Sequence, residues 1–165
     1  MGFFDKAKKF FGGHGVEVGF TRLERQEPGS VRFPVGDSVF KGNVVVRTSE
    51  PCTVLAHLYE VVVVRTGADG QEEEVVLASD RHDESTDIMG ADISWPYELP
   101  AGESKEDSFL VHSIDIRQAL RNFGFKDPGS SLEDPSLRFF VRFTADVKGS
   151  PFDPKAESDF QVVLG

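Results

Sequence analysis

The sequence contains a single cysteine, Cys52, so no internal disulfide can form and a framework of secreted-type bridges is excluded. Cys52 follows Pro51 and precedes an apolar run, which indicates a small core or strand-edge residue. A nucleophile is not the favoured interpretation, because no His or Asn accompanies this cysteine in a recognisable catalytic context. No apolar run reaches the length of a transmembrane helix. The first residues lack the features of a signal peptide, so the cytoplasm is the expected compartment.

Motifs of catalysis and cofactor binding are also lacking. The sequence has no GxSxG, P-loop or GxGxxG motif, and the GGHG at residues 12–15 is not followed by a helix that would help to hold a phosphate. The histidines are scattered, none at metal-binding spacing; they are His14, His57, His82 and His112. His57 and His112 lie in strand-like runs, where we expect hydrogen-bonded or surface-facing side chains. We therefore predict a protein that is not an enzyme and that uses no cofactor and no metal.

One acidic segment comes nearest to a metal cluster. It contains Asp80, His82, Asp83, Glu84 and Asp87, but it lacks the glycine turn and the terminal glutamate of a calcium loop. We interpret it as a solvated loop and keep weak cation binding as an alternative. The charged run at residues 72–74 lies beside a turn signal and would protect a sheet edge from pairing with another chain.

Charge and aromatic content restrict the class of partner and the kind of core. The formal net charge is −10 over 165 residues, which disfavours nucleic acid as a partner and leaves a basic protein partner open. Phenylalanine is abundant, with 15 Phe against one Trp and two Tyr. This composition predicts a dry core rich in aromatic rings, and the length suits one domain.

The first residues follow a helical period. The apolar positions at this spacing are Phe3, Phe4, Ala7, Phe10 and Phe11, and three lysines lie on the other face. We read residues 1–13 as a short amphipathic helix that ends in a glycine joint. This helix would dock on its own domain, bind the groove of a partner, or lie on an anionic membrane surface. The acidic body of the chain makes the membrane the less favoured of these.

From Val16 onward the period changes to two, which predicts a β-sandwich over residues 14–165. The expected strands are 16–20, 31–33, 39–47, 53–66, 74–78, 108–112, 137–147 and 160–164. Gly42 is a candidate bulge, and residues 53–79 resemble a hairpin. Residues 53–66 would form one central strand or two short strands with a bend. Residues 115–123 have helical spacing, with Asp115 as N-cap. The fold class is therefore an antiparallel, immunoglobulin-like all-β sandwich.

A further strand is expected at residues 93–99, where Ile93, Trp95, Tyr97 and Leu99 alternate with Pro96 on the opposite parity. Proline cannot donate to a ladder, so this strand should lie at an edge or contain a bulge. An exposed edge can accept a partner's strand. We therefore name Ile93, Trp95 and Tyr97 as candidate partner-binding residues beside the N-terminal set, with residues 16–20 as a second candidate edge.

Residues 33–46, FPVGDSVFKGNVVV, resemble a pattern found near the start of arrestin-type domains. The residues that carry it are Phe33, Gly36, Val39, Gly42, Val44 and Val46. The segments ISWPYELPAGESKEDSFLV and RFFVRFTADVKGSPFD resemble later parts of such domains. MGFFDKAKKFFGG and FLVHSIDIRQAL resemble the bacterial sporulation-control branch of that superfamily.

The resemblance implies an arrestin-like sandwich that serves as a protein-binding adaptor or regulatory scaffold in a bacterial cytoplasm. Members of the superfamily have two such domains, whereas this chain has length for one, so another chain could supply the second. Two other functions stay open: a peripheral membrane protein anchored by residues 2–11, and a sandwich domain that binds a small ligand or cation at residues 80–92 or 126–136. The identity of the partner, the pathway and the oligomeric state are left open.

Overall fold

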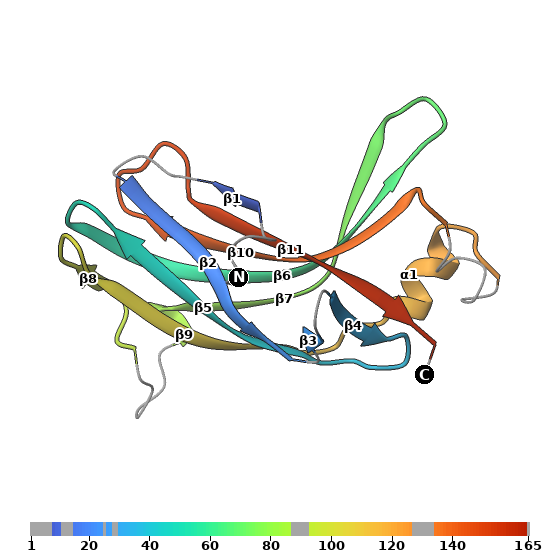
Figure 1. Ribbon diagram of the computed structural model, residues 1–165, viewed down its shortest axis with the longest axis horizontal. Coiled ribbons are helices and arrows are strands. Elements are labelled where there is room, and N and C mark those ends of the chain that lie inside the picture. Colours follow the sequence, from blue (N-terminus) through green and yellow to red (C-terminus); the bar gives the residue numbers. More distant parts are fainter. Residues whose placement is uncertain are drawn as a thin grey trace.

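The computed structural model describes residues 8–10, 15–24, 26–27, 30–86, 93–126 and 134–164. Two β-sheets face each other, with a short helix at one end (Figure 1). The first strands are β1 (Lys8–Phe10), β2 (Val16–Leu23), β3 (Gln26–Glu27), β4 (Ser30–Pro34), β5 (Phe40–Thr48) and β6 (Cys52–Thr66). They are followed by β7 (Glu72–Asp83), β8 (Tyr97–Leu99), β9 (Ser104–Val111), α1 (Ile116–Asn122), β10 (Leu137–Val147) and β11 (Lys155–Val163). The all-β sandwich expected from the sequence is confirmed.

The two sheets differ in size. The larger one has the order β3-β4-β11-β10-β6-β7, with β1 also paired to β11 and β8 also paired to β6. The smaller one has the order β2-β5-β9. All pairs are antiparallel except β4 with β11, which is parallel. Both β7 and β9 therefore end the order of their sheets within the described part of the chain, and they run alongside each other (Figure 1).

Aromatic rings fill the space between the sheets, as the phenylalanine content predicts. The rings of Phe40 and Phe160 lie 5.3 Å apart, and Tyr59 stacks on Phe109 at 4.6 Å and on Phe143 at 5.2 Å. The fully buried His57 lies among these rings. Its polar partners are described with the candidate site below.

Strand β6 is a single continuous central strand, which decides between the two alternatives for residues 53–66. Val61 and Val63 are fully buried between the sheets. Val62 on the opposite face is buried as well, in a small cluster with Phe140. The guanidinium of Arg138 lies 4.4 Å from the centre of the Phe140 ring. Strand β6 is therefore buried on both faces, which explains why its sequence carries apolar residues on both faces.

The interpretation of residues 80–87 as a polar loop is wrong for its first half. Strand β7 continues to Asp83, and its residues Asp80 and His82 pair with Tyr59 and His57 of β6. Backbone pairing along the long strand β6 outweighs the weak strand propensity of these polar residues. Residues Glu84–Thr86 then form a turn of 3₁₀ helix.

Gly42 is not a bulge, because β5 pairs with β9 in continuous register. The irregularity lies in β2, between Phe20 and Arg22. Glycine is needed at position 42 for close approach: a Cβ there would lie 2.7 Å from the carbonyl oxygen of Arg22 and 2.7 Å from a methyl carbon of Leu23.

The N-terminal helix is contradicted at its described residues. Lys8–Phe10 form β1, which pairs antiparallel with β11 with Lys8 opposite Glu157. Pairing with the edge of β11 gives the backbone hydrogen-bond partners that a short isolated helix would have to supply itself. Phe3, Phe4, Ala7 and Phe11 lie outside the described residues, and for them the helix stays a prediction.

The strand expected at residues 93–99 is shorter, since only Tyr97–Leu99 forms β8, paired with β6. Its position beside β6 agrees with the expected edge, and Pro96, which follows a cis Trp95–Pro96 bond, stays outside the ladder. The helix expected at 115–123 is confirmed as α1, whose N-cap Asp115 accepts a hydrogen bond from the Gln118 amide. Within the described ranges no helix is long and apolar enough to cross a membrane.

Candidate functional site

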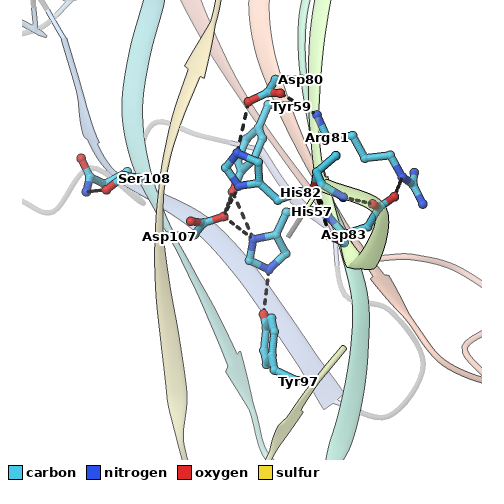
Figure 2. Close-up of polar contacts among 11 residues, drawn as sticks. His57, Tyr59, Asp80, Arg81, His82, Asp83, Tyr97, Asp107 and Ser108 are labelled. Carbon is cyan, nitrogen blue, oxygen red and sulfur yellow. Dashed lines mark hydrogen bonds and ion pairs between the residues drawn. The ribbon is translucent and has the colours of Figure 1, made fainter. Parts of the chain in front are cut away.

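The side of the sandwich where β7 meets β9 holds a cluster of polar side chains. We call it the edge cluster and define it as His57, Tyr59, Asp80, His82, Tyr97 and Asp107, contributed by strands β6, β7, β8 and β9 (Figure 2). Asp107 lies at its centre. Its parity on β9 matches that of the buried Phe109 and Val111, so the side chain points between the sheets.

One carboxylate oxygen, Oδ2 of Asp107, accepts three hydrogen bonds (Figure 2). The donors are the hydroxyl of Tyr59 at 2.5 Å, Nδ1 of His82 at 2.8 Å and Nδ1 of His57 at 2.9 Å. Burial alone would raise the pKa of Asp107, but the hydrogen bonds from His57, His82 and Tyr59 outweigh burial and hold this pKa well below its ordinary value. The central group is therefore an ionised carboxylate.

His57 is neutral, and its hydrogen bonds fix its tautomer. Nδ1 carries the proton that is donated to Asp107, and Nε2 lies 2.7 Å from the hydroxyl of Tyr97, which donates to it. The side chain is fully buried, and this burial lowers the pKa of His57 although the nearby Asp107 charge acts in the opposite direction. Trp95 and Phe143 meet the imidazole edge-on, with ring centres at 4.7 and 4.9 Å.

His82, unlike the neutral His57, carries a proton on both ring nitrogens. Its Nδ1 faces Asp107 at 2.8 Å and its Nε2 faces Oδ2 of Asp80 at 3.1 Å, so both ring nitrogens meet carboxylate oxygens. A carboxylate accepts and does not donate, hence both nitrogens must carry protons and the ring is an imidazolium. The hydrogen bond to Asp107 accordingly raises the pKa of His82, against partial burial. Its side chain is 28% exposed, so solvent can reach it.

A cleft of about 740 Å³ adjoins the edge cluster. Its lining comes from four strands and from the residue that follows β2. The lining residues are Arg22 and Leu23 of β2, Glu24 after it, Lys41, Gly42 and Asn43 of β5, Ser108, Phe109 and Leu110 of β9, and Asp80 and His82 of β7. Both signs of charge are present, and Leu110 adds an apolar side chain that is 40% exposed. The cleft thus combines outward-facing residues of the small sheet with the polar opening between the sheets.

Strand β9 offers a regular free edge beside this cleft. The amide of Thr48 donates to the carbonyl of Glu103, and from there hydrogen-bonded and non-hydrogen-bonded pairs alternate along β5 and β9. By this alternation the backbone groups of Ser104, Glu106, Ser108 and Leu110 point away from β5. Within the described ranges no strand pairs with this side of β9.

The other edges are less suited to accept a strand. Strand β2 has a register shift after Phe20, and β7 has one where it passes Val61 and Val62 and begins with three glutamates. Strands β3 and β8 have two and three residues. Bulges, charges and short length are the usual devices that block edge pairing; β9 carries charges at Lys105, Glu106 and Asp107, but it has neither bulge nor proline over its eight residues.

The titratable groups of the edge cluster are engaged with one another. His57 is sealed from solvent, and both nitrogens of His82 are held by carboxylates, so neither has a lone pair to offer a substrate. The pKa values of the Tyr59 and Tyr97 hydroxyls are raised by burial, which keeps them protonated. Burial likewise raises the pKa of the Cys52 thiol. Among the described residues no three potential ligands are placed to hold a metal ion.

The residues predicted to bind a partner are placed only in part, because Phe3, Phe4, Ala7 and Phe11 lie outside the described residues. Ile93 and Tyr97 are buried at 5% and 8% exposure, and the half-buried Trp95 packs on Tyr97 with ring centres 5.1 Å apart. Of the N-terminal set, Phe10 has its backbone in β1. A partner-binding role for these residues stays a prediction.

Sequence reasoning missed Tyr59, Asp80, His82 and Asp107 as members of one site. The signal for Asp107 was available, since it continues the inward parity of Phe109 and Val111, but the strand was expected to begin only at residue 108. The residues of the cluster are also far apart in sequence: His82 and Asp107 are separated by 25 positions.

Comparison with known proteins shows a likeness of fold. A crystal structure of Spo0M, the sporulation control protein of Bacillus subtilis, matches with a TM-score of 0.57 at 13% sequence identity. The match covers 92% of this chain and 49% of that chain, so the present chain spans about half of the Spo0M structure. The resemblance to the sporulation-control branch is thus supported at the level of the fold. No protein-family model and no curated protein matches the sequence.

Proposed function

We propose that this chain is a non-enzymatic, protein-binding adaptor or regulatory domain that takes up an extended segment of a partner at the free edge of β9. The observation that carries the proposal is the eight-residue edge without bulge or proline, lying beside a cleft that contains the exposed Leu110. Main-chain hydrogen bonds would provide affinity, and the cleft would select side chains. The fold likeness to a protein named for control of sporulation supports a regulatory role.

The test uses peptides, because the partner is unknown. A phage-displayed library of extended peptides is selected on the intact chain, and the affinity of the enriched peptides is measured by calorimetry. Glu106→Pro removes a backbone donor that the ladder alternation places on the free side of β9, while the pairing with β5 stays in place. We expect binding to this variant to fall below detection.

A matched pair of surface variants tests whether the peptide binds at β9 rather than at β7. Leu110 on β9 and Val76 on β7 are both apolar and similarly exposed, at 40% and 43%. We expect Leu110→Lys to weaken binding by about tenfold or more, because it places a charge at the apolar part of the edge, and Val76→Lys to leave it unchanged. Full binding to Glu106→Pro, equal effects of the two lysines, or a library without binders would contradict the proposal.

A further inference from the structure

Two edge strands from different sheets meet at the edge cluster through one histidine. His82 belongs to β7, the last strand of the large sheet, and Asp107 belongs to β9, the last strand of the small sheet. The contact between Nδ1 of His82 and Oδ2 of Asp107 is therefore a bond between the sheets. Asp80, which holds the other ring nitrogen, lies on the same strand as His82 and anchors the ring to β7.

We propose that His82 is a proton-operated latch that fastens β7 to β9 and opens when the imidazole loses its second proton. A neutral imidazole has one N–H, so after deprotonation one ring nitrogen presents a lone pair to a carboxylate oxygen. The proton can stay toward Asp80 or toward Asp107, but not both. In the first case the bond between the sheets is replaced by repulsion. In the second that bond keeps its donor but loses the positive charge of the ring, and the lone pair of Nε2 faces the Asp80 carboxylate, so the contact is weakened in both cases.

The groups around His82 stabilise the imidazolium form of its side chain and leave part of the ring exposed to solvent. On β7 the ring faces Asp80, and on β9 it faces Asp107. On β6 it approaches His57, which is neutral, and the ring of Tyr59 at 5.2 Å. The remaining charged groups near it line the cleft or neighbour it in sequence: Arg22, Glu24, Lys41, Arg81, Asp83 and Glu84. Arg81 is paired with Asp83 at 2.6 Å.

His57 cannot serve as this latch, although it bonds to the same oxygen. Its side chain is fully buried, and its second nitrogen accepts from Tyr97, so it holds one proton and has no carboxylate that demands another. His82 is partly exposed and can exchange its proton with solvent while the domain stays folded. The latch belongs to the unliganded chain, so it does not depend on strand addition at β9.

Nuclear magnetic resonance of the full chain tests the latch. The imidazole nitrogens of His82 are followed from pH 5 to 9, and amide exchange protection is measured for residues 79–83 of β7 over the same range. We expect both nitrogens of His82 to be protonated below about pH 6.5. As pH rises through the titration of His82, protection of these amides should fall about tenfold, the size expected for loss of a charge-assisted hydrogen bond.

Two variants separate the latch from a merely structural histidine. Asp80→Asn removes the carboxylate that requires the second proton, so the His82 titration and the loss of protection should move together to lower pH. His82→Gln should show low protection at every pH, whereas His112→Gln, at an exposed site after β9, should behave as the unmodified chain. A His82 that is neutral at pH 6, or one that titrates while protection of β7 stays constant, overturns the proposal.

Discussion

Nδ1 of His82 lies 2.8 Å from Oδ2 of Asp107, and that same oxygen receives hydrogen bonds from His57 and Tyr59. One carboxylate oxygen thus satisfies polar groups from the central strand and from the edge strand of the opposite sheet. The side chain of Asp107 is 12% exposed, so water can replace few of these hydrogen bonds. The stability of the sandwich should therefore depend strongly on Asp107.

Replacing Asp107 with asparagine keeps the shape and removes the charge. A single amide oxygen would then face three donors without a negative charge to hold them, and we expect the free energy of unfolding to fall by about 2–4 kcal/mol. Urea denaturation followed by fluorescence of the single tryptophan, which packs on His57, measures this. Asp159→Asn is the control, because Asp159 pairs with Arg138 at 2.8 Å but is 63% exposed, so its loss should be below about 1 kcal/mol. Equal losses would contradict the role given to Asp107.

His57 should make the fold sensitive to mild acid. Burial lowers the pKa of His57 in the folded chain, so below about pH 6.5 the unfolded chain takes up a proton that the folded chain refuses. Stability therefore falls as pH drops from that value toward the lowered pKa. His57→Gln removes this uptake, and its stability should decline less steeply between pH 7 and pH 5. Urea denaturation at several pH values gives the slopes.

His82 contributes to the same profile with the opposite sign, which provides an internal comparison. Its pKa is raised in the folded chain, so its stabilisation is complete below about pH 6.5 and is lost as pH rises through the raised value. His82→Gln should flatten the alkaline side of the profile and leave the acid side unchanged. If His57→Gln were to alter the alkaline side instead, the assignment of the two protonation states would be reversed.

Alternation of apolar residues was sufficient to predict most of the framework. Residues 137–147 were expected as a strand and form β10 with those bounds, because each inward position of this central strand carries an apolar side chain. The helix α1 was predictable from local chemistry, since its N-cap Asp115 acts within its own turn. The cap of α1 joins residues that are close in sequence, and the burial pattern of β10 repeats every second residue, so both elements could be predicted from the sequence.

The edge cluster could not be predicted in this way. At the open side of the sandwich the inward positions of β7 and β9 carry Asp80, His82 and Asp107, so the apolar period disappears where the site begins. Their partners are set by the packing of two sheets, and His57 and Asp107 are 50 positions apart. Propensity of single residues favoured a loop at 80–87, and tertiary pairing with β6 overrode it.

Gly42→Ala should destabilise the small sheet, because the new methyl group would meet the backbone of β2. The Cβ would lie 2.7 Å from the carbonyl oxygen of Arg22 and 2.8 Å from the ring of Phe109, which cannot both move away freely. We expect a loss of about 1–3 kcal/mol in the free energy of unfolding. Gly36→Ala is the control, since its Cβ would meet only the flexible end of Arg117 at 3.4 Å and should leave stability nearly unchanged. A neutral Gly42→Ala would show that β2 and β5 are not tightly apposed.

Arg142 on the outer face of the large sheet should stabilise the fold by joining carboxylates from three strands. Its guanidinium lies 3.0 Å from Glu60 of β6, 2.8 Å from Glu74 of β7 and 3.9 Å from Glu157 of β11, and the arginine side chain is 14% exposed. Arg142→Met leaves these carboxylates close together without their cation, and we expect a loss of about 1.5–3 kcal/mol. Thermal and urea unfolding at low and high salt measure it.

Salt separates charge repulsion from lost packing in this variant. Added salt screens the repulsion among the remaining carboxylates, so part of the stability lost in Arg142→Met should return at high salt. Arg81→Met is the matched control, because Arg81 also pairs with an acidic side chain, Asp83, but is 49% exposed, and its loss should stay below about 1 kcal/mol. A deficit in Arg142→Met that does not respond to salt would mean that the arginine acts through its contact with the Phe140 ring, at 5.9 Å, rather than through its charge.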